Sequence, residues 1–166
     1  MEQIRDYSLE DFKELLLNNF KNIYDLELLI LKGHIITEFT INCYLENLSN
    51  NSDANFFKGG YSHSLKIGMI EHFGRFGERS SGIIKSLRLL NKIRNGIAHN
   101  LSVNEQLIRE YINSVLQIAS TNFINPEYEL RLKFSLSTGY LCAEIFGEYY
   151  EEREKTKSNN GSNKKH

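Results

Sequence analysis

Apolar residues recur every three or four positions along most of the chain, which is the spacing of one face of an α-helix. The pattern predicts helices over 8–19, 22–48, 65–73, 81–98, 103–119 and 126–152. Polar segments containing glycine separate some of them, most clearly at 49–60. We therefore expect an all-α, up-down bundle of five main helices and one short helix, 65–73.

Local signals indicate where several helices begin. Ser8 is followed three residues later by Asp11, and Ser102 by Glu105, which is the spacing of a capping box. The asparagine and proline at 125–126 are typical of a helix cap and a first helical turn.

One segment carries a competing signal. Apolar and polar residues alternate strictly over 128–136, as they do in a half-buried strand. A single strand needs a partner, which a second chain or the 53–62 connection would have to supply. We favour a helix for 128–136, because no other segment completes a sheet.

Length and composition bound the class of protein. With 166 residues, 40% of them hydrophobic, we expect one domain over 1–152, followed by a disordered polar tail over 153–166. Cys43 and Cys142 match no metal or redox spacing, and the first residues lack the basic start of a targeting signal. Apolar runs are too short to span a bilayer, so we expect a soluble, cytoplasmic protein that does not bind membranes.

Charge is distributed unevenly although the net charge is only -1. Eight basic residues stand against two acidic residues between Lys58 and Arg94, which predicts a basic side. A polyanion such as RNA could bind there, with Lys85, Arg88 and Lys92 as the candidate contacts. The alternative is a solvated surface that happens to be rich in lysine and arginine.

The segment 94–99 holds the most informative chemistry, since Arg94, Asn95 and His99 lie near the predicted end of a helix. An imidazole titrates close to neutral pH and can move protons, while arginine is a permanent cation that binds phosphate. His99 could thus act as acid or base on a ribose 2′-hydroxyl or a 5′-oxygen, Arg94 could stabilise the phosphorane, and Asn95 could orient the imidazole. Structurally, the same residues could form an ion pair and a helix cap.

Helix geometry complicates this catalytic interpretation. At 100° per residue, Arg94 and His99 lie about 140° apart around the axis. Asn95 and His99 instead share an outward face with Lys92 and Arg88. The helix would have to unwind near Gly96, or a second subunit would have to bring its own copy alongside.

The stretch 89–100 resembles the Arg-x(4–6)-His signature of the HEPN superfamily, helical bundles that include many metal-independent ribonucleases of toxin and phage-defence systems. The segment 31–38 is similar to the second helix of HEPN-like proteins close to the mannitol operon repressor. The first resemblance implies a homodimeric ribonuclease with a site at the dimer cleft, formed by Arg94, Asn95 and His99 with Asn100 beside them. It also implies a protein antitoxin or other regulatory partner. The second implies a non-catalytic helical regulator or interaction module.

A polar stripe runs along the long helix predicted over 22–48. His34, Glu38 and Asn42 are spaced four residues apart and therefore share one face. A buried carboxylate needs a partner, and we expect Arg94 to pair with Glu38, either as a core ion pair or to position Arg94 for catalysis, with His34 beside them. His63 and His72 have no carboxylate or cysteine at ligand spacing, so the sequence predicts no metal site and no cofactor.

Overall fold

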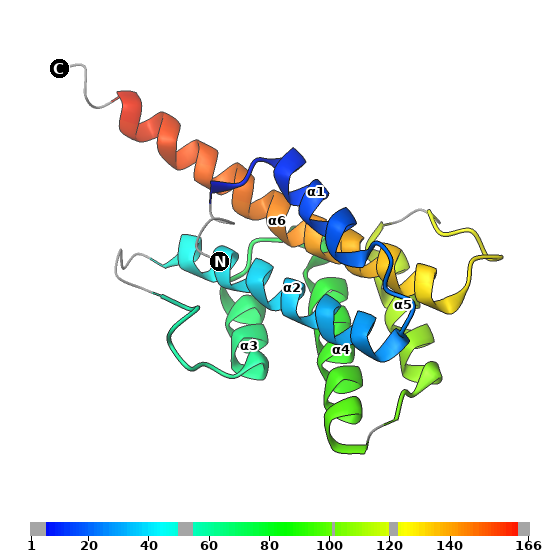
Figure 1. The fold of residues 1–166 in the computed structure, drawn as a ribbon. Coiled ribbons are helices and arrows are strands. Elements are labelled where there is room, and N and C mark those ends of the chain that lie inside the picture. Colours follow the sequence, from blue (N-terminus) through cyan, green and yellow to red (C-terminus); the bar gives the residue numbers. More distant parts are fainter. Residues whose placement is uncertain (1–5, 50–54, 101, 120–122, 163–166) are drawn as a thin grey trace.

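The computed structural model describes residues 6–49, 55–100, 102–119 and 123–162 and confirms the all-α bundle (Figure 1). The short helix predicted over 65–73 is present and begins at His63, and a 3₁₀ turn precedes the helix that carries Arg94. In chain order the elements are α1 (Leu9–Phe20), α2 (Leu26–Leu48), α3 (His63–Phe73), η2 (Gly77–Arg79), α4 (Ser80–Asn100), α5 (Glu105–Ala119) and α6 (Leu130–Ser162). None of the described helices combines the length and apolar character needed to cross a membrane.

The helices form two groups around α2. Figure 1 shows α1 and α6 side by side above α2, and α3, α4 and α5 below it. The main packing partners are α2 with α6 and α4 with α5, while α3 packs on both α2 and α4. This arrangement brings the polar stripe of α2 close to the start of α3 and to the middle of α4.

Helix starts follow local side-chain chemistry. The capping box at Ser8 is confirmed, because the Ser8 hydroxyl accepts from the Asp11 N–H and the Asp11 carboxylate accepts from the Ser8 N–H. The predicted box at Ser102 is wrong. Asn104 lies immediately before α5, and its side-chain oxygen accepts from the Leu107 N–H at 3.1 Å, so the helix starts later than expected.

The segment 128–136 resolves mainly into the amino end of α6. Asn125 and Tyr128 close a turn through a backbone hydrogen bond of 3.1 Å, and the helix begins only at Leu130, later than expected from Pro126. Buried positions then recur with helical spacing at 134, 137, 138, 141, 142, 145 and 146. The helix continues to Ser162, so 153–162 is helical where a disordered polar tail was predicted over 153–166; residues 163–166 lie outside the described part of the chain.

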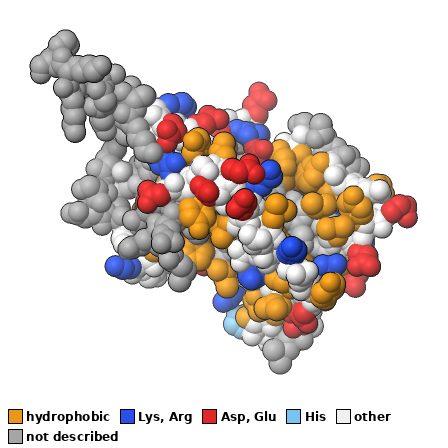
Figure 2. Space-filling model, turned by 45° about the horizontal axis from the view of Figure 1, so that its top comes forward, with side chains coloured by type: hydrophobic (Ala, Val, Ile, Leu, Met, Phe, Trp, Pro, Cys, Tyr) orange, Lys and Arg blue, Asp and Glu red, His pale blue; other side chains and the backbone are white. Residues whose placement is uncertain are grey.

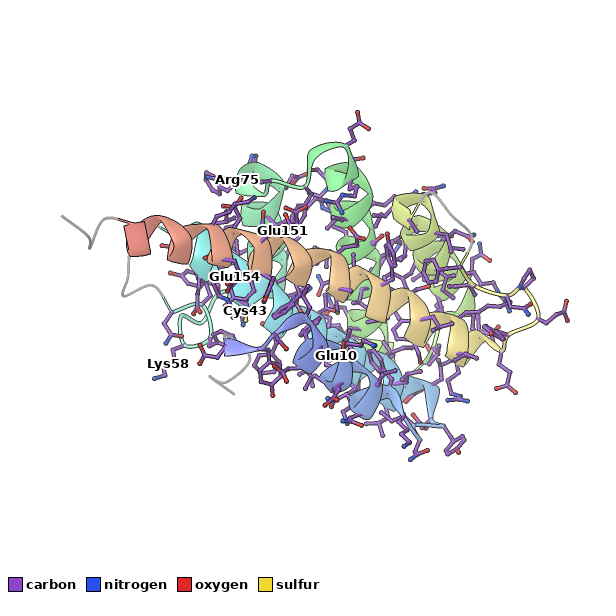
Figure 3. All side chains as sticks on the ribbon, turned by 90° about the horizontal axis from the view of Figure 1, so that it is seen from above. Glu10, Cys43, Lys58, Arg75, Glu151 and Glu154 are labelled. Carbon is purple, nitrogen blue, oxygen red and sulfur yellow. The ribbon has the colours of Figure 1, made fainter. Side chains whose placement is uncertain are left out.

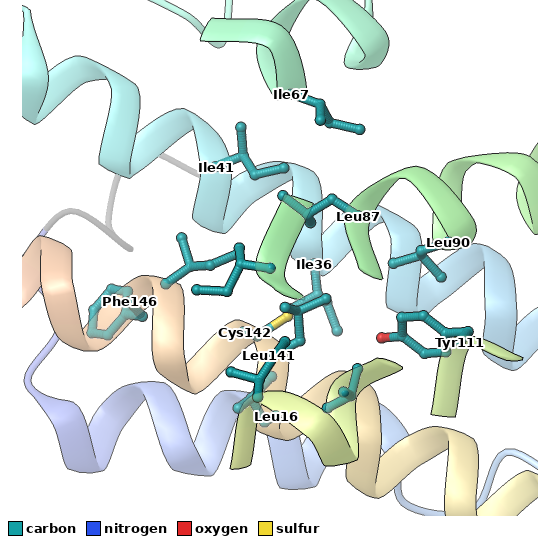
Figure 4. Packing of buried hydrophobic residues seen from close by; sticks show 14 of the residues in the cluster. Leu16, Ile36, Ile41, Ile67, Leu87, Leu90, Tyr111, Leu141, Cys142 and Phe146 are labelled. Carbon is teal, nitrogen blue, oxygen red and sulfur yellow. The ribbon is translucent and has the colours of Figure 1, made fainter. Parts of the chain in front are cut away.

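A single hydrophobic cluster draws residues from all six helices (Figure 4). Tyr111 is fully buried, and its hydroxyl donates to Thr138 at 3.0 Å. Elsewhere in the core, Ser86 on α4 and Ser114 on α5 are joined at 2.7 Å. These buried hydroxyls have partners on neighbouring helices, which fixes how the helices face one another.

Candidate functional site

The Arg-x4-His segment occupies the last two turns of α4. Leu90, Ile93 and Ile97 bury one face of these turns, so the polar residues between them point elsewhere. Arg94 is half-buried, and its Nη1 donates to Asn95 Oδ1 at 3.1 Å. His99 is exposed near the end of the helix. Within one chain the helix stays regular, so Arg94 and His99 point in different directions.

The basic stripe on α4 lines a groove. Lys85, Arg88 and Lys92 are exposed and contribute to a hollow of about 810 Å³ between α4 and α5, with Glu71 of α3 and Glu110 of α5 also lining it. Their spacing of three and four residues explains the shared face. Asn95 and His99 continue this face toward the end of α4 by the same spacing.

The predicted basic side is partly neutralised by acidic neighbours. Arg88 pairs with Glu71 at 2.6 Å, and Arg79 pairs with two glutamates of α6, Glu144 and Glu148. Arg75 lies beside the carboxyl-terminal half of α6 (Figure 3), 3.6 Å from a carboxylate there. On the face shown in Figure 2, acidic and basic side chains likewise lie close together. The field of the α4 groove is therefore weaker than the count of basic residues implies.

Glu38 does not pair with Arg94 as predicted. Its carboxylate accepts from Lys66 Nζ at 2.7 Å, because α3 packs against α2 and places Lys66 in the interior. Lys66 is only 4% exposed, so it also does not belong to the basic surface. Burial raises the pKa of the Glu38 carboxyl, but the bond and ion pair with Lys66 outweigh that effect and hold the pKa below its ordinary value.

His34 and His63 lie against each other, with ring centroids 4.2 Å apart. Burial is the main cause that lowers the pKa of His63, the neighbouring His34 adds to it, and together with smaller effects they bring the pKa to about 4. Burial also lowers the pKa of His34; Glu38 opposes this effect and Arg94 adds to it. Both imidazoles are thus held neutral, and Arg94 is close enough to influence both.

Three of these side chains are close enough to share a ligand. One donor atom each of His34, Glu38 and His63 can be chosen so that all lie within 4.8 Å of one another. Sequence spacing revealed the pair on α2 but not His63, because that residue joins them only through the packing of α3. The prediction of no metal site rested on local spacing alone and did not include this grouping.

A second hollow of about 420 Å³ opens beside this cluster. Glu38, Asn42 and Lys66 line it together with Phe57 and Lys58 of the connection before α3. Figure 3 places Lys58 at the outer edge of the bundle. The Asn42 side-chain oxygen is buried, and no residue in the described part of the chain forms a hydrogen bond with it. The polar stripe of α2 therefore contacts His63 through His34 and lines the hollow through Glu38 and Asn42.

The structure thus separates the predicted site residues into two groups. Arg94, Asn95 and His99 lie at the end of α4, while His34 and Glu38 lie with His63 and Lys66 between α2 and α3. The side chain of Asn100 lies outside the part of the chain that the structure describes. A helical bundle alone identifies no activity, since many unrelated families share it. No protein-family model, curated protein or solved structure matches this chain.

Proposed function

We propose that this protein is a metal-independent endoribonuclease of the HEPN type that acts as a homodimer. One observation carries the proposal: the exposed cations of the α4 groove lie on the same helix face as Asn95 and the exposed His99. Phosphates held along Lys85 and Lys92 would lead an RNA strand toward the imidazole.

The chemistry follows from the side chains at the end of α4. His99 removes the proton of a ribose 2′-hydroxyl or delivers one to the leaving 5′-oxygen. Arg94 stabilises the pentacoordinate phosphorane through charge-assisted hydrogen bonds. Asn95 already contacts Arg94 and shares a face with His99, so it can hold both in register.

The dimer supplies what a single helix lacks. Arg94 and His99 point about 140° apart on a regular helix, so one α4 cannot direct both at one phosphate. A two-fold axis near the ends of two α4 helices brings the partner's copy of the segment alongside and provides a second histidine as the partner acid. A protein antitoxin covering this end would restrain the enzyme.

The competing function is a non-catalytic helical regulator. It is favoured by the ion pairs that neutralise Arg75, Arg79 and Arg88, because they reduce the attraction for a polyanion. On that account the Arg94–His99 segment would stabilise a protein interface.

Product analysis distinguishes the two functions. Incubated with an RNA oligonucleotide in excess EDTA, the full chain is expected to release a fragment ending in a 2′,3′-cyclic phosphate, which mass spectrometry identifies. A matched oligonucleotide with one 2′-deoxyribose at the cleaved position should stay intact there, because the attacking hydroxyl is missing. Circular dichroism in the same buffer verifies that the protein stays folded. Intact RNA, or a product without the cyclic phosphate, would contradict the proposal.

A further inference from the structure

The polar cluster between α2 and α3 contains unusual buried nitrogens. Nε2 of His34 and both ring nitrogens of His63 are buried and have no hydrogen-bond partner among the described residues. His34 itself is only 6% exposed. A buried nitrogen that nothing binds has lost its hydration without compensation and lowers the stability of the fold. Their grouping therefore indicates that these atoms serve a ligand.

We propose that His34, Glu38 and His63 bind one divalent transition-metal ion, with Zn²⁺ the best match, and that the ion links α2 to α3. Two imidazoles and one carboxylate form a donor set that Zn²⁺ uses in proteins. Neutral imidazoles have the free electron pair that a metal requires. His34 and Glu38 lie one turn apart on α2, so both face the same point.

The geometry requires only a small closure around the ion. Tetrahedral Zn²⁺ with bonds of about 2.0–2.1 Å holds its donor atoms about 3.4 Å apart. The three donors lie within 4.8 Å of one another. His63 is the first residue of α3 and follows an irregular connection, so its ring can rotate toward the other two. Water from the neighbouring hollow, lined by Glu38 and Asn42, can take the fourth position.

Lys66 and Arg94 are the charges that oppose this ion. Lys66 Nζ lies 2.7 Å from Glu38 Oε1 and competes directly for the carboxylate. Arg94 lies on α4 and not on α2 or α3, but its positive charge lowers the pKa of both histidines and therefore also acts on the cluster. Metal binding must therefore overcome the positive charge of Lys66 and its bond to Glu38 Oε1, which makes Lys66 a modulator of metal affinity.

Isothermal titration of the full chain with ZnCl₂, after removal of metals, tests the proposal. We expect one Zn²⁺ per chain, a d–d absorption typical of tetrahedral Co²⁺ when cobalt replaces zinc, and a raised melting temperature. His63→Gln removes one of the three donors and should weaken Zn²⁺ binding by about tenfold or more. Because His63 is only half-buried, we expect the variant to keep the fold. His72→Gln, at an exposed histidine of the same helix, is the matched control and should bind like the wild type.

Lys66→Met is a second variant, and we expect it to change the Zn²⁺ affinity in the opposite direction from His63→Gln. Removing the competing ammonium frees Glu38 and should strengthen Zn²⁺ binding by about tenfold or more. No binding by the wild type, binding that survives His63→Gln, or weaker binding by Lys66→Met would overturn the proposal. The titration contains no RNA and His99 is not among the donors, so its outcome is separate from that of the cleavage assay.

Discussion

Cys142 shows how burial sets the chemistry of single residues in this bundle. The thiol is fully buried on α6, 3.3 Å from the Thr37 hydroxyl of α2. Burial raises its pKa from 9.0 to about 11 although that neighbour favours the thiolate. Because the thiol stays protonated, Cys142 is a packing residue in the folded protein.

The raised pKa predicts a loss of stability in alkali. Between about pH 9 and pH 11 the unfolded chain releases the Cys142 proton while the folded chain keeps it, so the free energy of unfolding falls as pH rises. Urea titrations should show the wild type losing roughly 2 kcal/mol more over this range than Cys142→Ala, in which the thiol is missing. Tyr111, whose pKa burial also raises, contributes to both proteins and cancels. Parallel pH profiles would contradict this assignment.

Two glycines of α4 differ in how closely other side chains pack against them. A Cβ added at Gly82 would lie 2.7 Å from Ile118 Cγ1, because α5 crosses there. At Gly96, beside Arg94 and Asn95, an added Cβ would meet no described atom within 4 Å. Packing inside one chain therefore explains Gly82 but not Gly96.

The contrast predicts opposite effects of alanine. Gly96→Ala should raise the free energy of unfolding by up to about 1 kcal/mol, through helix propensity alone. Gly82→Ala gains the same propensity but forces Ile118 to move, which costs about 1–3 kcal/mol. The free energy of unfolding should therefore fall by up to about 2 kcal/mol overall. Chemical unfolding of both variants measures the difference. Equal shifts in both variants would show that the α4–α5 crossing is looser than described.

Element boundaries were predictable where a single local signal decided them. The capping box at Ser8 needs only three neighbouring residues, and its pattern in the sequence sufficed. The start of α5 was missed because Ser102 and Asn104 both offer caps, and the side chain nearer to the helix is the one used. The alternation over 128–136 was a competing strand signal because α6 packs against several neighbouring helices, which blurs a single apolar stripe; the preference for a helix is confirmed from Leu130 onward.

At the scale of the whole molecule, the packing of α3 on α2 completes a polar cluster that the sequence alone did not predict. Sequence spacing placed His34 and Glu38 on one face of α2, but only the fold adds His63 and Lys66 to them. The predicted partner of Glu38 was wrong for the same reason. The faces of α4 were predictable, since helical spacing alone separates Arg94 from His99. A dimer that reunites them stays a prediction.

The most direct measurement is the rate of RNA cleavage in excess EDTA by the wild type and by His99→Ala. We expect the variant to lose about 10²-fold or more in rate while its RNA affinity stays unchanged, because His99 moves protons and the cations of the α4 groove hold the strand. His72→Ala, at an exposed histidine on α3, should cleave like the wild type. RNA left intact by the wild type, or cut equally fast by His99→Ala, would contradict the assignment of the site to the end of α4.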